Sequence, residues 1–173
     1  LPAQQVENFC EGAANCIPDR MEVVFDSTGN SALTLADGQA SFDVTVQTVS
    51  ESDGVQGWSY GLAHDGDSYS IADSACDGAE LDYLCGTDAQ AALVNPFFNV
   101  STRVGAAQNS PEGFISAVVL SFIAPATLTA GGQSNSLAKL TYNVDAVPGA
   151  SSLIRLADDE LSNNGPTVAL NIT

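Results

Sequence analysis

The sequence predicts an all-β fold, an antiparallel β-sandwich of the jelly-roll type with about nine strands. Segments in which apolar and polar residues alternate recur along the chain at intervals of about 10 to 20 residues. Clusters of Gly, Asn, Asp and Ser separate these segments, as expected of turns between strands. Apolar residues at the helical period do not continue over any long segment, which disfavours a helical fold.

The alternating segments define the expected strands. Residues 41–49 alternate most clearly, with every second residue from Phe42 to Val46 expected to point inward. Residues 136–144 alternate in the same way, whereas residues 113–123 are apolar on both faces and indicate a strand covered on both sides. The other expected strands contain Trp58 or cover residues 20–26, 31–36, 69–71, 97–104, 152–156 and 167–172.

One short helix is expected at residues 87–94. Thr87 is a suitable N-cap, and the residues that follow it favour a helix. Pro96 then ends the segment, because proline cannot continue a helix.

Residues 54–65, with the sequence GVQGWSYGLAHD, contain the only tryptophan and the only histidine of the chain. Trp58, Tyr60 and Leu62 fall on one face of a strand, and small residues fall on the other. A large aromatic residue on a strand that follows a Gly-rich turn indicates the core of a sandwich. His64 is expected to be a structural residue at the end of this strand.

The composition indicates one folded domain with an unusual charge. The chain has 173 residues, of which 45% are hydrophobic and only 14% charged. Its net charge of −17 comes from 21 acidic and 4 basic residues, so nucleic acid and anionic membranes are unsuitable partners. No apolar run reaches the length of about 18 residues that a membrane-spanning helix needs, so membrane insertion is not expected.

The cysteines indicate an oxidising compartment. An even number of them, at Cys10, Cys16, Cys76 and Cys85, predicts two disulfides. Pairs 10–16 and 76–85 are favoured among three possible pairings because each closes a short loop, and a zinc site is disfavoured because C-x-x-C spacings are missing. The chain begins at Leu1 without a methionine, so a secreted or cell-surface protein whose signal peptide has been removed is expected.

Residues 1–18 form a polar arm outside the pattern of the sandwich, which is expected to cover residues 19–173. Its few apolar residues include Leu1, Val6 and Phe9. Such an arm could add a strand to the sheet edge of a neighbouring copy and so propagate an assembly.

Acidic residues crowd one loop and suggest a weak structural calcium site, although no cofactor is required. The candidate ligands are Asp73, Asp77, Glu80 and Asp82. The competing interpretation is a solvated acidic loop, and the high acidity also fits solubility in a salty or calcium-rich medium.

Aromatic residues and sequons define two further kinds of candidate site. Exposed rings could bind a glycan, but aromatic residues make up only 7% of the chain. The candidate rings are Tyr69, Tyr83, Phe97 and Phe98. Asn99 and Asn171 begin N-x-S/T triplets and would be glycosylation acceptors in a eukaryotic secretory pathway.

Catalytic residues are not expected. A Ser-His-Asp arrangement would have to use His64, and its neighbour Asp65 points to the opposite face of a strand. The G-x-S-x-G motif is missing. A pair of carboxylates for glycoside hydrolysis remains open in so acidic a chain, but carboxylates alone are unspecific.

Four segments occur in the order in which cohesin-like domains carry them: residues 41–49, 54–62, 113–120 and 136–144. The chain resembles these domains from about residue 22 to residue 172. The resemblance implies a nine-stranded jelly-roll sandwich that binds other proteins outside the cell, as in the docking of dockerin modules, and a fold related to some carbohydrate-binding modules. The cysteines depart from the family pattern, and no binding residue carries over.

These observations together favour a non-catalytic extracellular module. Its expected partner is another protein or copies of itself, in docking, adhesion or assembly of a surface or extracellular fibre. The alternative is a carbohydrate-binding module.

Overall fold

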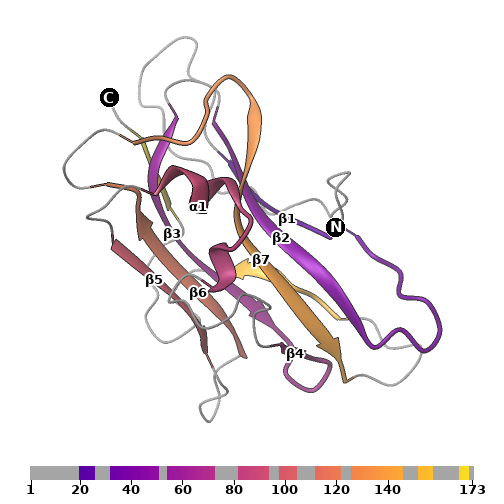
Figure 1. Ribbon diagram of the computed structural model, residues 1–173. Helices are drawn as coiled ribbons and strands as arrows, with labels where there is room; N and C mark the ends of the chain where they lie inside the picture. Colours follow the sequence, from indigo (N-terminus) through magenta and orange to yellow (C-terminus); the bar gives the residue numbers. More distant parts are fainter. Residues whose placement is uncertain are drawn as a thin grey trace.

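The computed structural model describes residues 20–25, 32–50, 54–72, 82–93, 98–104, 112–121, 126–145, 152–157 and 168–171. These ranges contain nine strands in two antiparallel sheets, one 3-10 turn and one short α-helix. The two sheets face each other as the layers of a sandwich (Figure 1). The predicted all-β sandwich with one short helix is therefore confirmed.

The four-stranded sheet has the order β1-β2-β7-β4. Its strands are β1 (Arg20–Val24), β2 (Ser41–Ser50), β7 (Gln133–Val144) and β4 (Tyr69–Ile71). β2 and β7 pair along ten residues of β2, with one register shift between Val46 and Gln47. The long central pair explains why these two segments alternate most clearly in the sequence.

The five-stranded sheet has β3 at its centre. Its strands are β5 (Phe98–Val104), β6 (Glu112–Val119), β3 (Val55–His64), β8 (Arg155–Ala157) and β9 (Val168–Asn171). β6 pairs with one edge of β3, and β8 and β9 pair with the other edge, one after the other. β8 and β9 thus act as two halves of one interrupted edge strand, which no alternation pattern could have shown.

Two sequence-based expectations need correction. Residues 32–36, expected as part of a strand, pair with no strand in the described part of the chain, and Leu33 stays 41% exposed. β1 instead pairs directly with β2. Residues 113–123 were expected to be covered on both faces, but β6 ends at Val119 and its outward side chains are only partly buried.

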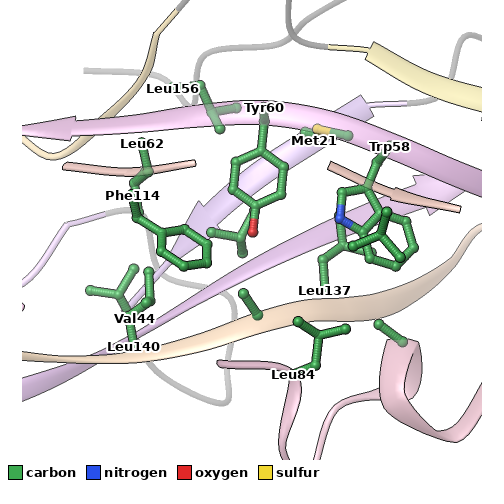
Figure 2. Packing of buried hydrophobic residues seen from close by; sticks show 14 of the residues in the cluster. Met21, Val44, Trp58, Tyr60, Leu62, Leu84, Phe114, Leu137, Leu140 and Leu156 are labelled. Carbon is green, nitrogen blue, oxygen red and sulfur yellow. The ribbon is translucent and has the colours of Figure 1, made fainter. Parts of the chain in front are cut away.

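The core lies between the sheets. Trp58, Tyr60 and Leu62 point from β3 toward Leu137 and Leu140 of β7, and all five are buried (Figure 2). The predicted inward residues of β2 and of β7 are buried in the same cluster, apart from the half-buried Val144. The expected orientation of the three alternating strands is confirmed.

The helical segment covers the edge of β7 that β4 leaves open, since β4 pairs only with residues 142–144. The 3-10 turn η1 (Asp82–Leu84) and the helix α1 (Asp88–Ala92) place Leu84 and Ala89 in the core. Thr87 caps α1 as predicted, accepting a hydrogen bond from Gln90 N–H. No helix in the described ranges is long and apolar enough to cross a membrane.

Polar contacts hold this segment on β7. Asp88 Oδ2 accepts hydrogen bonds from the backbone N–H and the hydroxyl of Ser136, both at 2.8 Å. Lys139 Nζ donates to the carbonyl of Gly86 at 2.7 Å. Cys85, in the same segment, is disulfide-bonded. The other three cysteines lie outside the described residues, so the pairing remains a prediction.

Candidate protein-interaction face

The outer face of the five-stranded sheet is the surface that β3 turns away from the core. Because side chains alternate along a strand, the residues of β3, β5, β6 and β8 that lie between the inward-pointing ones share this face, although those of β3 and β8 are mostly buried within the chain. We call it the apolar face; it comprises Gly57, Ser59, Gly61, Ala63, Phe98, Val100, Thr102, Gly113, Ile115, Ala117, Val119, Arg155 and Ala157.

The strand registers align these residues in rows across the sheet. Val100 of β5 lies opposite Ala117 of β6, which in turn lies opposite Ser59 of β3. Phe98 begins the neighbouring row, followed by Val119 and Gly57. The rows are apolar at β5 and β6 and consist of small residues at β3.

Small residues keep the face flat around β3. Ala63, Ala157 and Ile115 pack together there as an apolar cluster separate from the core. At Gly57 a Cβ atom would lie 2.6 Å from the carbonyl oxygen of Val118, so a larger residue does not fit at this point. Ala63 and Ala157 are only 2% and 3% exposed, so the exposed apolar side chains of the face are those of β5, Phe98 and Val100.

Large apolar side chains that remain exposed are few among the described residues, and half of them lie on this face. Four such residues are 41–49% exposed, and two of them, Phe98 and Val100, stand on β5. A third, Leu153, precedes β8 and alternates with the core residues Ile154 and Leu156. The fourth, Leu33, lies in the loop before β2.

The apolar face also lacks the acidity of the rest of the chain. Arg155 is the one charged side chain on it among the residues that the structure describes, although the chain has 21 acidic residues. A sheet face on which the described residues carry no acidic group is unexpected in so acidic a protein.

The outer face of the four-stranded sheet has the opposite character. Asp43 Oδ1 accepts a 2.7 Å hydrogen bond from the hydroxyl of Thr141 on the next strand. At the β1 edge, Glu22 accepts hydrogen bonds from Arg20 Nε at 2.7 Å and from Gln47 Nε2 at 2.8 Å. Burial raises the pKa of Glu22, but these hydrogen bonds outweigh it and hold the pKa below its usual value. Ionised and hydrogen-bonded side chains suit a face that remains in water.

β5 explains why the apolar face was not predicted. Its inward side chains are polar: Ser101 Oγ lies 3.1 Å from Ser116 Oγ, and Arg103 donates to the carbonyl of Ile71 in the other sheet. Its outward side chains include Phe98 and Val100. Sequence reasoning singled out Phe98 only as an aromatic ring, and the apolar second face of residues 113–123 was the one signal of this surface.

The candidate glycan-binding rings do not form a common surface. Tyr69 packs edge-on against Phe42, and Tyr83 packs against Phe114, so both rings are partly buried on the core. Phe98 is exposed on β5, and Phe97 lies outside the described residues.

Most of the other candidate site residues lie outside the described part of the chain. These are Leu1, Val6, Phe9, Asp73, Asp77 and Glu80, together with the side chains of Asp82 and Asn171. The described residues contain no group of three metal-binding side chains. Asn99 is half-buried on β5, where its Oδ1 accepts a 2.7 Å hydrogen bond from Ser101.

His64 ends β3 and is 5% exposed, the position expected of a structural residue. The carboxylate of Asp65 takes part in a turn, where it accepts hydrogen bonds from Asp67 N–H and from the hydroxyl of Ser68. His64 is therefore the last residue of β3, and Asp65 is the first residue of the turn that follows.

The chain matches no protein-family model, no curated protein and no solved structure.

Proposed function

We propose that this protein is a non-catalytic extracellular interaction module that binds another protein through the apolar face. The observation that carries the proposal is the contrast between the two outer faces of the sandwich. One is polar and charged, while the other exposes Phe98 and Val100 on β5 and carries Arg155 as its charged residue within the described ranges.

The chemistry of the face specifies the kind of partner. Burial of Val100 and Phe98 favours an apolar centre in the partner's contact surface. The rest of the molecule carries a net charge of −17, so basic residues at the margins of that surface would be attracted and would speed association. The proposed partner is a protein with an apolar contact surface bordered by Lys and Arg.

A second copy of the chain suits the face less well. Two copies would each bring a charge of −17 to the contact. Strands are about 4.8 Å apart and rise about 3.3 Å per residue, so β5, β6 and β3 cover roughly 330 Å² over seven residues. That is less than half of the roughly 800 Å² that each partner buries in a stable interface. A partner that also reaches the acidic margins would make up the difference.

We also propose that the sandwich is cohesin-like. The support for this proposal is that residues 54–62 fall in β3 and residues 136–144 in β7, the central strands of the two sheets. The extracellular location is supported by the disulfide at Cys85.

Carbohydrate binding is the second candidate function. Phe98 is the observation that favours it, because this ring is 44% exposed on a flat sheet. A flat sugar-binding surface needs several exposed rings, but Tyr69 and Tyr83 are packed against the core.

A photo-crosslinking amino acid at Val100 tests the proposal, with the same substitution at Leu33 as the control. Both positions are 41% exposed, but Leu33 lies away from the apolar face. Val100 should crosslink to a discrete partner in the extracellular fraction of the source cells, and Leu33 should not. The partner is then purified, and its affinity for the Val100→Glu and Leu33→Glu variants is measured by calorimetry.

The expected result is that Val100→Glu weakens binding of the purified partner at least about tenfold, because it buries a charge in an apolar contact. Leu33→Glu should leave the dissociation constant unchanged. Equal affinities of the two variants would rule out the apolar face. If light scattering shows a large assembly that Val100→Glu disperses, the partner is a second copy; if only a glycan array gives a signal, the second candidate function replaces the first.

A further inference from the structure

His64 packs the end of β3 against the opposite sheet. Its ring lies edge-on to the ring of Tyr142, with 5.2 Å between the centroids and 88° between the planes. Tyr142 belongs to β7 of the four-stranded sheet. The His64 side chain is only 2% exposed, so its ring makes a buried contact between the two sheets at this end.

Neither ring nitrogen of His64 makes a hydrogen bond in the described part of the structure. The Oε2 atom of Glu112, the cross-strand neighbour on β6, lies 3.6 Å from Nε2, beyond hydrogen-bond length. A neutral imidazole leaves one N–H donor unpaired at this position. A charged imidazolium would place a positive charge at a buried position, where Glu112 offsets only part of the cost of burial.

The described groups around His64 act in both directions. Glu112 of β6 and Asp65 of the following turn are acidic and favour a positive charge. The backbone of Tyr69 in β4 also favours the charged ring, whereas Tyr142 of β7 is neutral and helps to exclude water. Burial is the larger effect, and it lowers the pKa of His64 below its ordinary value of 6.5 despite the two carboxylates.

We propose that protonation of His64 loosens the packing of the two sheets at this end of the sandwich. When the ring takes up a proton, it leaves its contact with Tyr142 and moves toward water together with Glu112, which Nε2 already faces at 3.6 Å. Gly66 lies directly under the Glu112 carboxyl group, where a Cβ atom would be 2.6 Å from Glu112 Cδ. Movement of Glu112 with the ring therefore loosens the turn at residues 65–68 and the short strand β4 that follows.

The direction of the pH dependence follows from the positions of the two pKa values. The unfolded chain titrates near 6.5 and the folded chain below it, so the unfolded chain binds the proton more tightly. The stability due to neutral His64 is fully present above pH 6.5 and is lost as the pH falls through the folded pKa. The chain has one histidine, and side chains of other types rarely titrate between about pH 5 and 8.

Urea unfolding of the whole chain, followed by Trp58 fluorescence at about pH 7.5 and about pH 5.5, tests the proposal. The wild-type midpoint should fall on acidification by at least twice as much as that of His64→Phe, which keeps an aromatic ring but cannot take a proton. Glu112→Gln should show a larger fall than the wild type, because it removes a carboxylate that favours the charged ring. Equal falls in the wild type and His64→Phe would overturn the proposal.

Two measurements on the wild type alone keep the test valid if His64→Phe does not fold. The proton resonance of the His64 ring should titrate with a midpoint below 6.5; a midpoint at or above that value overturns the proposal. Amide hydrogens of residues 65–71 should exchange faster at the lower pH, relative to their intrinsic rates, than those of residues 42–48. Equal changes in both segments would show that acid acts on the whole fold and would also overturn it.

Discussion

At the scale of single residues, a buried chain of polar groups fixes how β3 and β6 meet. Trp58 Nε1 donates to Ser116 Oγ at 3.1 Å, and Ser116 contacts Ser101, which is bonded to Asn99. Ser116 is 1% exposed, so water cannot replace it as the acceptor. The indole is thus held in one orientation as well as buried.

Replacement of Ser116 tests this role. Ser116→Ala leaves the N–H of Trp58 unpaired in the core, so the free energy of unfolding should fall by about 1 to 3 kcal/mol. Ser70→Ala is the matched control, because its hydroxyl makes a 2.8 Å bond to Asp145 at the surface; its effect should stay within about 0.5 kcal/mol. Urea unfolding followed by Trp58 fluorescence gives both values, and equal losses would contradict the role of Ser116.

At the scale of elements, the sandwich protects β7 with a helix instead of a strand. β4 covers only the end of β7, and the η1–α1 segment covers Ser136 and Lys139. Open strand edges invite pairing with other chains, so this cover limits unwanted association. The hydrogen bonds from Ser136 hold the pKa of Asp88 below its ordinary value of 3.8.

Asp88→Ala should loosen this cover. The substitution removes the acceptor of both Ser136 bonds, and the expected loss of stability is about 1 to 2 kcal/mol. Amide exchange at Ser136 should speed up more than at residues 42–46 of β2. Asp37→Ala, in the exposed turn before β2, serves as the control and should change neither quantity. In the wild type, the contribution of Asp88 is present above pH 3.8 and is lost as the pH falls through its lowered pKa. An unchanged exchange rate in Asp88→Ala would contradict the proposed cover.

At the scale of the whole molecule, the four basic residues cannot neutralise 21 acidic ones. Three of the basic side chains donate hydrogen bonds to particular groups. Arg20 donates to the Glu22 carboxylate, Arg103 to the carbonyl of Ile71, and Lys139 to the carbonyl of Gly86. Repulsion among the remaining carboxylates opposes the compact state, and salt screens it.

The melting temperature should therefore rise with sodium chloride between about 0.01 M and 0.5 M at neutral pH, over which range the screening length shortens from about 30 Å to a few ångströms. The same titration near the isoelectric point of about 4.1 is the control, because the net charge is then close to zero. A melting temperature that does not change with salt at neutral pH, or an equal rise at both pH values, would show that charge repulsion does not limit stability.

The sequence alone determined the elements that depend on local pattern. Alternation predicted the buried faces of β2, β3 and β7, and the N-cap at Thr87 predicted α1, because these signals arise within a few neighbouring residues. The sequence also predicted that Trp58 lies in the core, because a large aromatic ring on an alternating strand is usually buried. The net charge, which limits the classes of partner, needs no structure at all.

For β5 and β6, only the tertiary structure decided which side of the strand meets water. Alternation divides a strand into two faces but does not say which face is inside when both carry apolar residues, as in β6, or when the inner one is polar, as in β5. Strand pairing between distant segments settles that choice, and it brought Phe98, Val100 and the small residues of β3 onto one surface. The contact of His64 with Tyr142, 78 positions later in the chain, arises in the same way. It depends on how the two sheets pack together, which no single segment of the sequence determines.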